Sequence, residues 1–268
     1  MKIIRYFWII IVVITLFNVG FYLIEPGGET ALLYVSDSLP VLCSLLAVVC
    51  LIYTQKSLGK FDYIKSAWMM ILIGIFSFFI GETIYAYLEI GLQWDMNENF
   101  PVVADFFWCF GYLPILIGLF TFFYGYKKSG LPIGDFTLYG FIAITIFFML
   151  AIVIYFLLIP IIEDQETDLL AKIAYVFYPV ADMLVVVPSV LLIYITSLFG
   201  SSKVTRPIKY LAFGFLFITI ADLLYSFLGW KDLYGSGNLI DVAWHLGYLF
   251  IALAALYQKQ LVESLKGI

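Results

Sequence analysis

The sequence predicts an all-α protein embedded in a membrane. Of its 268 residues, 64% are hydrophobic and only 12% are charged, and the mean hydropathy is +1.05. These values lie far outside the range of soluble globular proteins. Eight stretches are predominantly apolar over about 20 residues, the length that an α-helix needs to cross roughly 30 Å of hydrocarbon. We therefore expect a polytopic protein with eight transmembrane helices in the lipid bilayer, and no soluble domain.

Short loops separate the predicted spans, so any chemistry must be built from the helices and their ends. The first span follows Lys2 and Arg5 as a secretory signal would, but no small-residue cleavage site follows it, which favours an uncleaved helix. The three cysteines lie within predicted spans, where they behave as small apolar residues. The predicted spans are approximately 3–24, 31–53, 66–91, 102–125, 136–160, 170–198, 208–229 and 239–257.

The basic residues are segregated between the loops. Twelve of the 14 Lys and Arg residues fall at the N-terminus, in alternate loops or at the C-terminus, and only Lys172 and Lys231 fall on the opposite side. The positive-inside rule therefore places both termini in the cytoplasm. We expect an integral protein of the cytoplasmic (plasma) membrane, with acidic loops on the outer side.

The chain contains an internal duplication. In the first half, "FFIGETIYAYL" (78–88) precedes "PVVADFFWCFGYLPILIGL" (101–119), and in the second half "ITIADLLYSFL" (218–228) precedes "NLIDVAWHLGYLFIALAAL" (238–256). Two units with an even number of spans have the same orientation, so we expect parallel four-helix repeats about a pseudo-two-fold axis along the membrane normal. They comprise residues 1–128 and residues 129–268, the second with a short cytoplasmic tail. The alignment pairs Glu82 with Asp222, Tyr85 with Tyr225, Asp105 with Asp241, Trp108 with Trp244, Gly111 with Gly247, Tyr112 with Tyr248 and, more weakly, Asp37 with Asp182.

The paired polar residues are spaced to share helix faces. Asp105, Trp108 and Tyr112 are at positions i, i+3 and i+7 of one predicted helix. A carboxylate that faces lipid costs several kcal/mol, so such faces are expected to point into the bundle or a wet cavity. Most of these residues fall in the outer half of the membrane, which predicts a pocket open to the outside. The candidate ligand-binding residues are Glu82, Tyr85, Asp105, Trp108, Tyr112, Asp182, Asp222, Tyr225, Asp241, Trp244, His245 and Tyr248.

The chemistry of these side chains leaves several ligands open. Carboxylates and aromatic rings suit a small cationic organic ligand, and an apolar ligand or a divalent cation is an alternative. Asp222, Asp241 and His245 are weak candidates for a metal site, because spacing alone supports them and the counterpart of His245 is Cys109. Retinal is disfavoured because no Lys lies in the interior of the last two spans, since Lys209 is at a span end, and no other cofactor is indicated. In the alternative without a ligand, each acid hydrogen-bonds a neighbouring helix and serves only packing.

The second half resembles a known class of membrane sensor. "YPVADMLVVVPSVLLI" (178–193), "IADLLYSF" (220–227) and "LIDVAWHLGYLFIALAAL" (239–256) are similar to the multi-spanning N-terminal regions of bacterial GGDEF-type diguanylate cyclases and sensor histidine kinases. The resemblance implies a membrane sensor placed before a cytoplasmic output domain. After the last span only "QKQLVESLKGI" (258–268) remains. We therefore expect either that an output domain follows in a longer chain or that a free-standing version signals through a cytoplasmic partner.

Three functions follow from these patterns. The first is a sensor or ligand-binding module, in which a ligand in the outer pocket shifts the eighth helix and so signals to the cytoplasm. The second is an intramembrane lipid-processing enzyme with paired carboxylates as acid and base, although the chain has no HExxH, DDxxD-like or nucleophile motif. The third is a small secondary transporter, which parallel repeats allow. We favour the sensor, leave enzymatic activity uncertain and expect no nucleic-acid partner.

Overall fold

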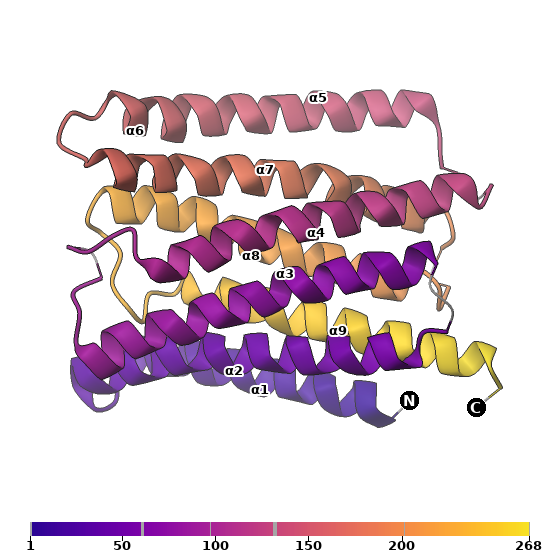
Figure 1. The fold of residues 1–268 in the computed structure, drawn as a ribbon, viewed down its shortest axis with the longest axis horizontal. Coiled ribbons are helices and arrows are strands. Elements are labelled where there is room, and N and C mark those ends of the chain that lie inside the picture. The colour runs from indigo at the N-terminus through magenta and orange to yellow at the C-terminus, as the bar shows by residue number, and fades with distance from the viewer. Residues whose placement is uncertain (1, 60–61, 97, 131–132, 201, 268) are drawn as a thin grey trace.

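The computed structural model describes residues 2–59, 62–96, 98–130, 133–200 and 202–267, and all regular secondary structure in them is helical. Long helices run back and forth along one direction and form a bundle (Figure 1). Two spans contain a π-helical turn: α3 continues into η1, and α5 continues through η2 into α6. The helices are α1 (Lys2–Ile24), α2 (Gly28–Ser57), α3 (Tyr63–Ala86), η1 (Tyr87–Gly91), α4 (Val103–Lys128), α5 (Phe136–Val153), η2 (Ile154–Leu158), α6 (Ile159–Glu163), α7 (Leu169–Ser197), α8 (Arg206–Trp230) and α9 (Asp241–Leu265).

Three helices begin at an aspartate that caps them. The side chains of Asp62, Asp135 and Asp168 accept hydrogen bonds from backbone N–H groups in the first turns of α3, α5 and α7. Such a cap satisfies a backbone donor that has no partner within the helix. These aspartates help to fix where α3, α5 and α7 begin.

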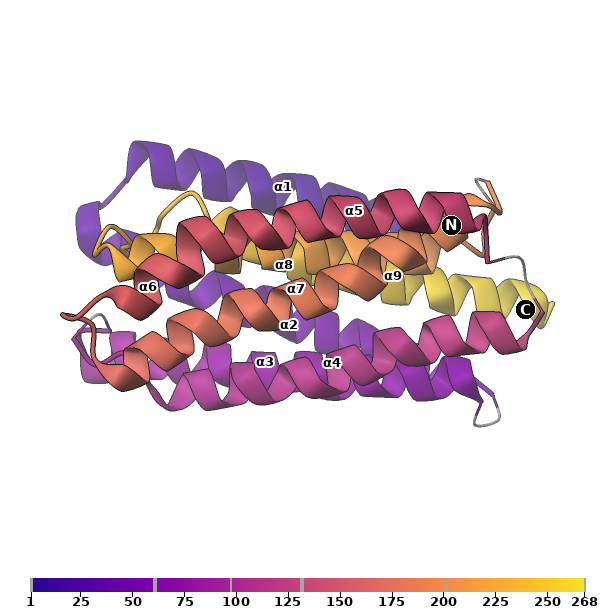
Figure 2. The same cartoon turned by 90° about the horizontal axis from the view of Figure 1, so that it is seen from above.

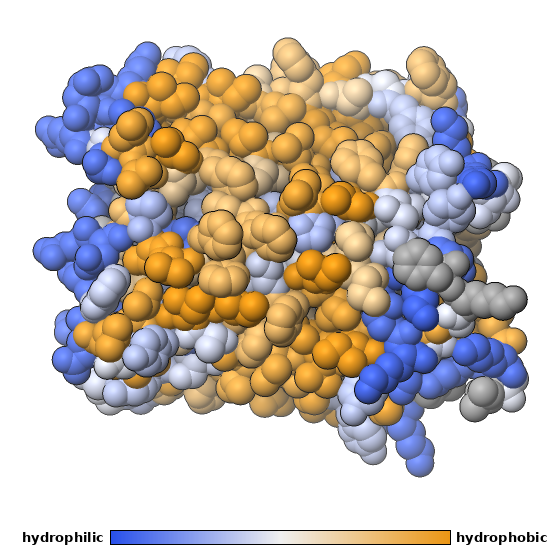
Figure 3. Space-filling view, in the orientation of Figure 1, coloured by the Kyte–Doolittle hydropathy of each residue, from blue (hydrophilic) through white to orange (hydrophobic). Residues whose placement is uncertain are grey.

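Seven segments are long and apolar enough to cross a membrane: α1, α2, α3 with η1, α4, α5 with α6, α7 and α8. Apolar side chains form a broad band across the face shown in Figure 3, and hydrophilic side chains gather at its two ends. The predicted eighth span corresponds to α9, which equals α8 in length at 25 residues. Asp241 and His245 near its start and Gln258 and Lys259 toward its end lower its mean hydropathy, so apolarity alone does not mark it as a span.

Six helices form a closed ring. Successive packing contacts join α2 to α3, α3 to α4, α4 to α7, α7 to α8, α8 to α9, and α9 back to α2. The other two long segments lie outside the ring: α1 packs on α9, and α5 contacts α7. Accordingly α5 lies along one edge of the bundle in Figure 1 and α1 along an edge in Figure 2. The start of α1 and the end of α9 lie at the same end of the bundle (Figure 1).

Glycine pairs allow two of the ring contacts to be close. A Cβ added to Gly74 on α3 would lie 2.7 Å from the carbonyl oxygen of Gly111 on α4. At the corresponding contact, a Cβ on Gly214 of α8 would lie 2.9 Å from the carbonyl oxygen of Gly247 on α9. Real Cβ atoms do not approach a backbone oxygen so closely without rearrangement, so only glycine fits. Gly111 and Gly247, which the internal alignment pairs, thus lie at the two close helix contacts.

Candidate functional site

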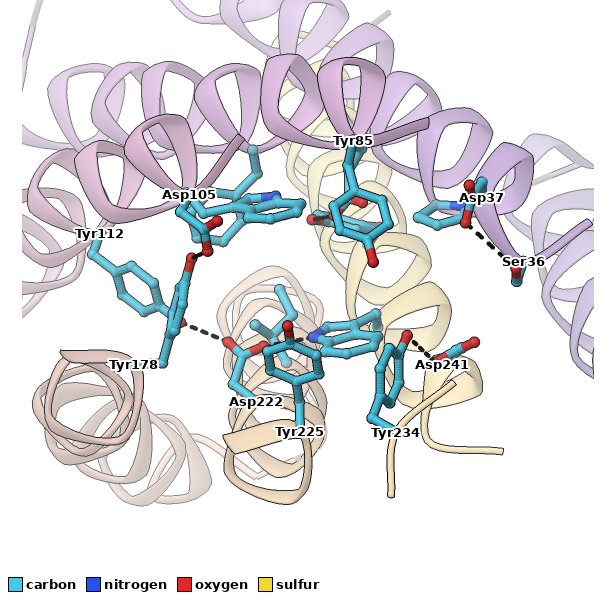
Figure 4. A pocket seen from close by; sticks show the side chains of 17 residues that line it. Ser36, Asp37, Tyr85, Asp105, Tyr112, Tyr178, Asp222, Tyr225, Tyr234 and Asp241 are labelled. Carbon is cyan, nitrogen blue, oxygen red and sulfur yellow. Dashed lines mark hydrogen bonds between the residues drawn. The ribbon is translucent and has the colours of Figure 1, made fainter. Parts of the chain in front are cut away.

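A cavity of about 90 Å³ lies within the ring, toward the end of the bundle away from the start of α1 (Figure 4). Its walls come from the last turns of α3 and α8, the first turns of α4 and α9, and the neighbouring parts of α2 and α7. Ten of the 12 predicted ligand-binding residues line it: Glu82, Tyr85, Asp105, Trp108, Tyr112, Asp222, Tyr225, Asp241, Trp244 and Tyr248.

The first carboxylate set is built around Glu82, which α3 places in the wall of the cavity. The hydroxyl of Tyr248 donates to Glu82 Oε1 at 2.5 Å, and the indole N–H of Trp108 also donates to this carboxylate. The ring of Tyr85 lies 5.7 Å from that of Trp108 between centroids. The donor Tyr248 comes from α9, in the other half of the chain. Glu82 is therefore held by a side chain from each half.

The second carboxylate set is built around Asp222 on α8 and repeats this arrangement. The hydroxyl of Tyr112 donates to Asp222 Oδ2 at 2.6 Å, and the indole N–H of Trp244 donates to Oδ1 at 2.6 Å. The rings of Tyr225 and Trp244 lie 5.7 Å apart between centroids, which matches the first set. Here the donor from the other half is Tyr112 on α4. The two sets thus exchange tyrosines across the cavity, as Figure 4 shows for Tyr112 and Asp222.

Two further aspartates combine a place in the cavity wall with a structural role at a helix start. Asp105 Oδ2 accepts from the backbone N–H of Val102 at 2.7 Å, while Oδ1 accepts from the hydroxyl of Tyr178 at 2.6 Å. Asp241 at the start of α9 likewise accepts from the backbone N–H of Gly237 and from the hydroxyl of Tyr234, each at 3.0 Å. Removing either carboxylate would therefore disturb a helix end as well as the cavity.

Tyr234 reaches the cavity from the loop between α8 and α9. Burial, and next the neighbouring Asp241 carboxylate, raise the pKa of the Tyr234 hydroxyl well above its ordinary value of 10.0. The phenol therefore keeps its proton at physiological pH and remains a hydrogen-bond donor to Asp241. This contact joins the loop to the start of α9 in the wall of the cavity.

Asp182, predicted as a ligand-binding residue, does not line the cavity. Its Oδ1 atom lies 2.9 Å from the hydroxyl of Tyr112 and 3.3 Å from that of Thr219. Asp182 is linked to the cavity through Tyr112, which also contacts Asp222, and through a side-chain hydrogen bond with Asp222 itself. The weak alignment of Asp182 with Asp37 does not reflect equivalent places, since Asp37 is itself in the cavity wall.

His245 also lies outside the cavity wall, because it occupies a different face of α9 from Trp244 and Tyr248. It is 1% exposed, and its Nδ1 atom lies 2.6 Å from Asn18 Nδ2 on α1. With the amide as donor, the imidazole accepts at Nδ1. The placement of His245 in the predicted pocket was therefore wrong: this side chain joins α9 to α1.

The weak metal candidates Asp222, Asp241 and His245 are held by three separate sets of partners. Across the described residues, no three His, Cys, Asp or Glu side chains are grouped so as to hold a metal ion. Asp222 is engaged by Tyr112 and Trp244, and Asp241 by the loop before α9. The structure does not bring these three residues together as a ligand set.

Several cavity residues were not among the predicted ligand-binding residues. Tyr234 lies in a glycine-containing loop with no helical periodicity, so no pattern in the sequence pointed to it. Asp37 and Tyr178 did carry a signal, since each is a polar residue within a predicted span. The additional lining residues are Ser36, Asp37, Pro40, Phe78, Tyr178, Ile218 and Tyr234.

Comparison with known proteins leaves the site to be interpreted from its own geometry. No protein-family model matches the chain, and no match is found among curated proteins or solved structures.

Proposed function

We propose that this protein is a membrane sensor whose cavity binds a ligand and passes a shift of α9 to a cytoplasmic partner. In this proposal all eight helical segments, α9 included, span the membrane as two parallel four-helix repeats. Both termini are cytoplasmic, so the cavity opens toward the outside. The cavity, the duplication and the course of α9 support the proposal in turn.

The packing pattern supports the duplication. If α2, α3 and α4 correspond to α7, α8 and α9, every contact in the ring has a counterpart: α2–α3 with α7–α8, α3–α4 with α8–α9, and α4–α7 with α9–α2. The glycine contacts of Gly74 with Gly111 and of Gly214 with Gly247 correspond in the same way. A two-fold axis through the ring accounts for both observations.

The exchanged tyrosines are the observation that carries the proposal. Tyr112 of the first half donates to Asp222 of the second, and Tyr248 of the second half donates to Glu82 of the first. Both bonds lie in the cavity wall. A ligand that contacts either carboxylate therefore alters a contact between the halves, which is the property that a sensor needs.

The helix α9 provides a route from the cavity to the other side of the membrane. Its first two turns carry Asp241, Trp244 and Tyr248, which line the cavity, and its 25 residues extend about 37 Å at the α-helical rise. A displacement at its start is transmitted along a continuous helix to residues 258–265. For this to act as a signal, the ligand must favour one arrangement over the other, typically by about 1–3 kcal/mol.

The test uses full-length protein in detergent and a panel of amines, amino acids, carboxylates, quinones and divalent metal ions. We expect at least one class to raise the melting temperature of the wild type, since a ligand that binds the folded state stabilises it, and to lose this effect in Asp222→Asn. The same compound should change the distance between spin labels at Ser129, just after α4, and Ser264, near the end of α9. The labels require prior replacement of Cys43, Cys50 and Cys109.

Tyr155→Phe is the matched control, because its side chain is 66% exposed on the outside of the bundle and it should respond as the wild type does. The sensor proposal fails if no compound stabilises the protein, or if stabilisation persists in Asp222→Asn. Binding without a change in the label distance would leave a binding protein that has no output through α9.

A second cavity favours transport as the alternative function. It has a volume of about 220 Å³ and lies between the same two halves at the opposite end of the bundle, where Asp62, Thr121 and Gln258 contribute polar groups. Along α4 and α9 the two cavities are separated by residues that include the buried Leu119 and Ala252. Accumulation of a panel compound inside proteoliposomes, driven by a proton gradient and lost in Asp222→Asn, would favour transport over sensing.

A further inference from the structure

The wall of the cavity within the ring has an unbalanced charge. Five of its 17 lining residues carry carboxyl groups, and none of the 17 is Lys, Arg or His. The ion pair between Lys259 and Glu263 is at the far end of α9 and does not compensate them. Burying carboxylates away from water and without a cation costs several kcal/mol. A positive charge from outside the chain would offset this cost, as would protonation of some of the carboxyl groups.

Aromatic rings form most of the remaining wall. Nine of the 17 lining residues are Phe, Tyr or Trp. Figure 4 shows Tyr85 and Tyr225 extending toward each other from opposite sides of the cavity, and each is paired with a tryptophan of its own half. A cation within about 6 Å of such a ring is attracted to its face, and more strongly where water is excluded. Aromatic faces beside carboxylates suit an organic cation that has both charge and apolar surface.

The hydrogen bonds of the carboxylates distinguish an organic cation from a metal ion. Both oxygens of Asp105, Asp222 and Asp241 already accept from a neutral N–H or O–H donor. Direct coordination of a metal ion needs several ligand atoms around one point, and the described residues supply no group of three metal ligands. An ammonium group needs only a nearby carboxylate oxygen that has a spare lone pair. Asp37 Oδ2 is buried, and one side chain that interacts with this carboxyl group is another acid, Glu89.

From these observations we infer that the ligand of this cavity is a small organic ammonium ion, held between the two carboxylate sets and against the rings of Tyr85 and Tyr225. This inference rests on the proposed function and names the class of its ligand. The volume of about 90 Å³ leaves room for a compact amine.

Binding is measured by isothermal titration on the full-length protein in dodecyl maltoside, because phospholipid head groups can themselves carry ammonium ions that compete. The probes are choline and 1,4-diaminobutane, and the uncharged isosteres are 3,3-dimethylbutan-1-ol and 1,4-butanediol. We expect at least one ammonium probe to bind about tenfold or more tightly than its isostere. Glu82→Gln and Asp222→Asn should each weaken it by about tenfold or more, while Tyr155→Phe leaves it unchanged.

The variant Tyr225→Leu keeps the inference testable if the carboxylate variants fail to fold. It removes an aromatic face and leaves the hydrogen bonds of Glu82, Asp105, Asp222 and Asp241 in place, so it should weaken the ammonium probe and spare the isostere. Equal binding of probe and isostere would overturn the cation assignment and leave a ligand-binding cavity. Binding of Mg²⁺ or Ca²⁺ alone, or of no ammonium probe, would also overturn it, while the wider compound panel still tests the sensor.

Discussion

At the scale of single residues, the two carboxylate sets are similar but not equivalent. In the first, Tyr248 donates to Glu82. In the second, the hydroxyl of Tyr112 lies within hydrogen-bond distance of two carboxyl groups, those of Asp222 and Asp182. Tyr112 therefore belongs to a larger polar cluster than its counterpart Tyr248, although its hydroxyl has only one proton to donate.

This difference predicts that Tyr112→Phe destabilises the protein more than Tyr248→Phe. Loss of the Tyr248 hydroxyl removes one interhelical hydrogen bond, for which about 0.6 kcal/mol is typical in a membrane protein. Loss of the Tyr112 hydroxyl removes a polar group that bridges two buried carboxyl groups and should cost about 1–3 kcal/mol. Unfolding free energies in bicelles measure both, with the exposed Tyr155→Phe as the neutral control. Equal losses, or the reverse order, would contradict the role assigned to Tyr112.

Much of the cavity wall could be predicted at this scale because helical spacing places Asp, Trp and Tyr side chains on one face. Spacing within one helix does not specify the partner on another helix. The exchange of Tyr112 and Tyr248 between the halves was therefore not predictable. The same limit applies to His245, whose partner Asn18 comes from α1, a helix with no other feature that points to α9.

At the scale of helices, close packing depends on small residues at the contacts α3–α4 and α8–α9. The contact between α8 and α9 gives a strict test of this close packing. A Cβ on Gly214 would lie 2.6 Å from a side-chain carbon of Ile251 and 2.9 Å from the carbonyl oxygen of Gly247. By contrast, a Cβ on Gly140 of α5 would have no other atom within 4 Å.

We expect Gly214→Ala to lower the free energy of unfolding by about 1–3 kcal/mol, because the helices must separate to admit the methyl group. Gly140→Ala should be neutral or stabilising by up to about 1 kcal/mol, since alanine is the better helix former. Thermal unfolding of both variants in the same detergent gives the comparison. A Gly214→Ala protein as stable as Gly140→Ala would contradict the close contact of α8 with α9.

The existence of the helices was well predicted, because long runs of apolar residues with few charges are typical of membrane-spanning helices. The ends were less well predicted: the span expected at 31–53 corresponds to α2, which begins at Gly28 and ends at Ser57. The π-helical turns η1 and η2 were not anticipated, since a single inserted residue leaves little mark on hydropathy. In α9 one residue of the cavity wall, Asp241, contributes with His245, Gln258 and Lys259 to the weak signature of this helix as a span.

At the scale of the whole molecule, the proposed topology makes a direct prediction. The start of α1 and the end of α9 lie at one end of the bundle (Figure 1), and the loop after α4 should lie with them in the cytoplasm. In a protein lacking native cysteines, single cysteines at Ser129 and Ser264 should react with a membrane-impermeant maleimide only in inverted vesicles, and one at Gln165 only in intact cells. Labelling of Ser129 and Gln165 from the same side would exclude this topology.

The order of packing around the ring was only partly predictable. Internal similarity indicates that two halves correspond, and an even number of spans in each implies the same orientation. The internal similarity does not reveal that α4 contacts α7 and that α9 contacts α2, because those contacts depend on the shapes of the helix surfaces where the two halves meet. The outer helices depart from the pattern altogether, since α1 packs on α9 whereas α5 contacts α7.

The different positions of α1 and α5 have a mechanical consequence. The large apolar side chains of α4 that face outward, such as Phe106, Leu113 and Phe120, are 52–67% exposed. In the proposed topology this wall of the cavity therefore borders lipid and can move outward. The opposite wall is reinforced: Trp8 of α1 packs edge-on against Phe250 of α9, and Asn18 holds His245. In the proposed sensor a movement of α9 would therefore be passed to α1, and the cytoplasmic partner would meet two neighbouring helix ends that change position together.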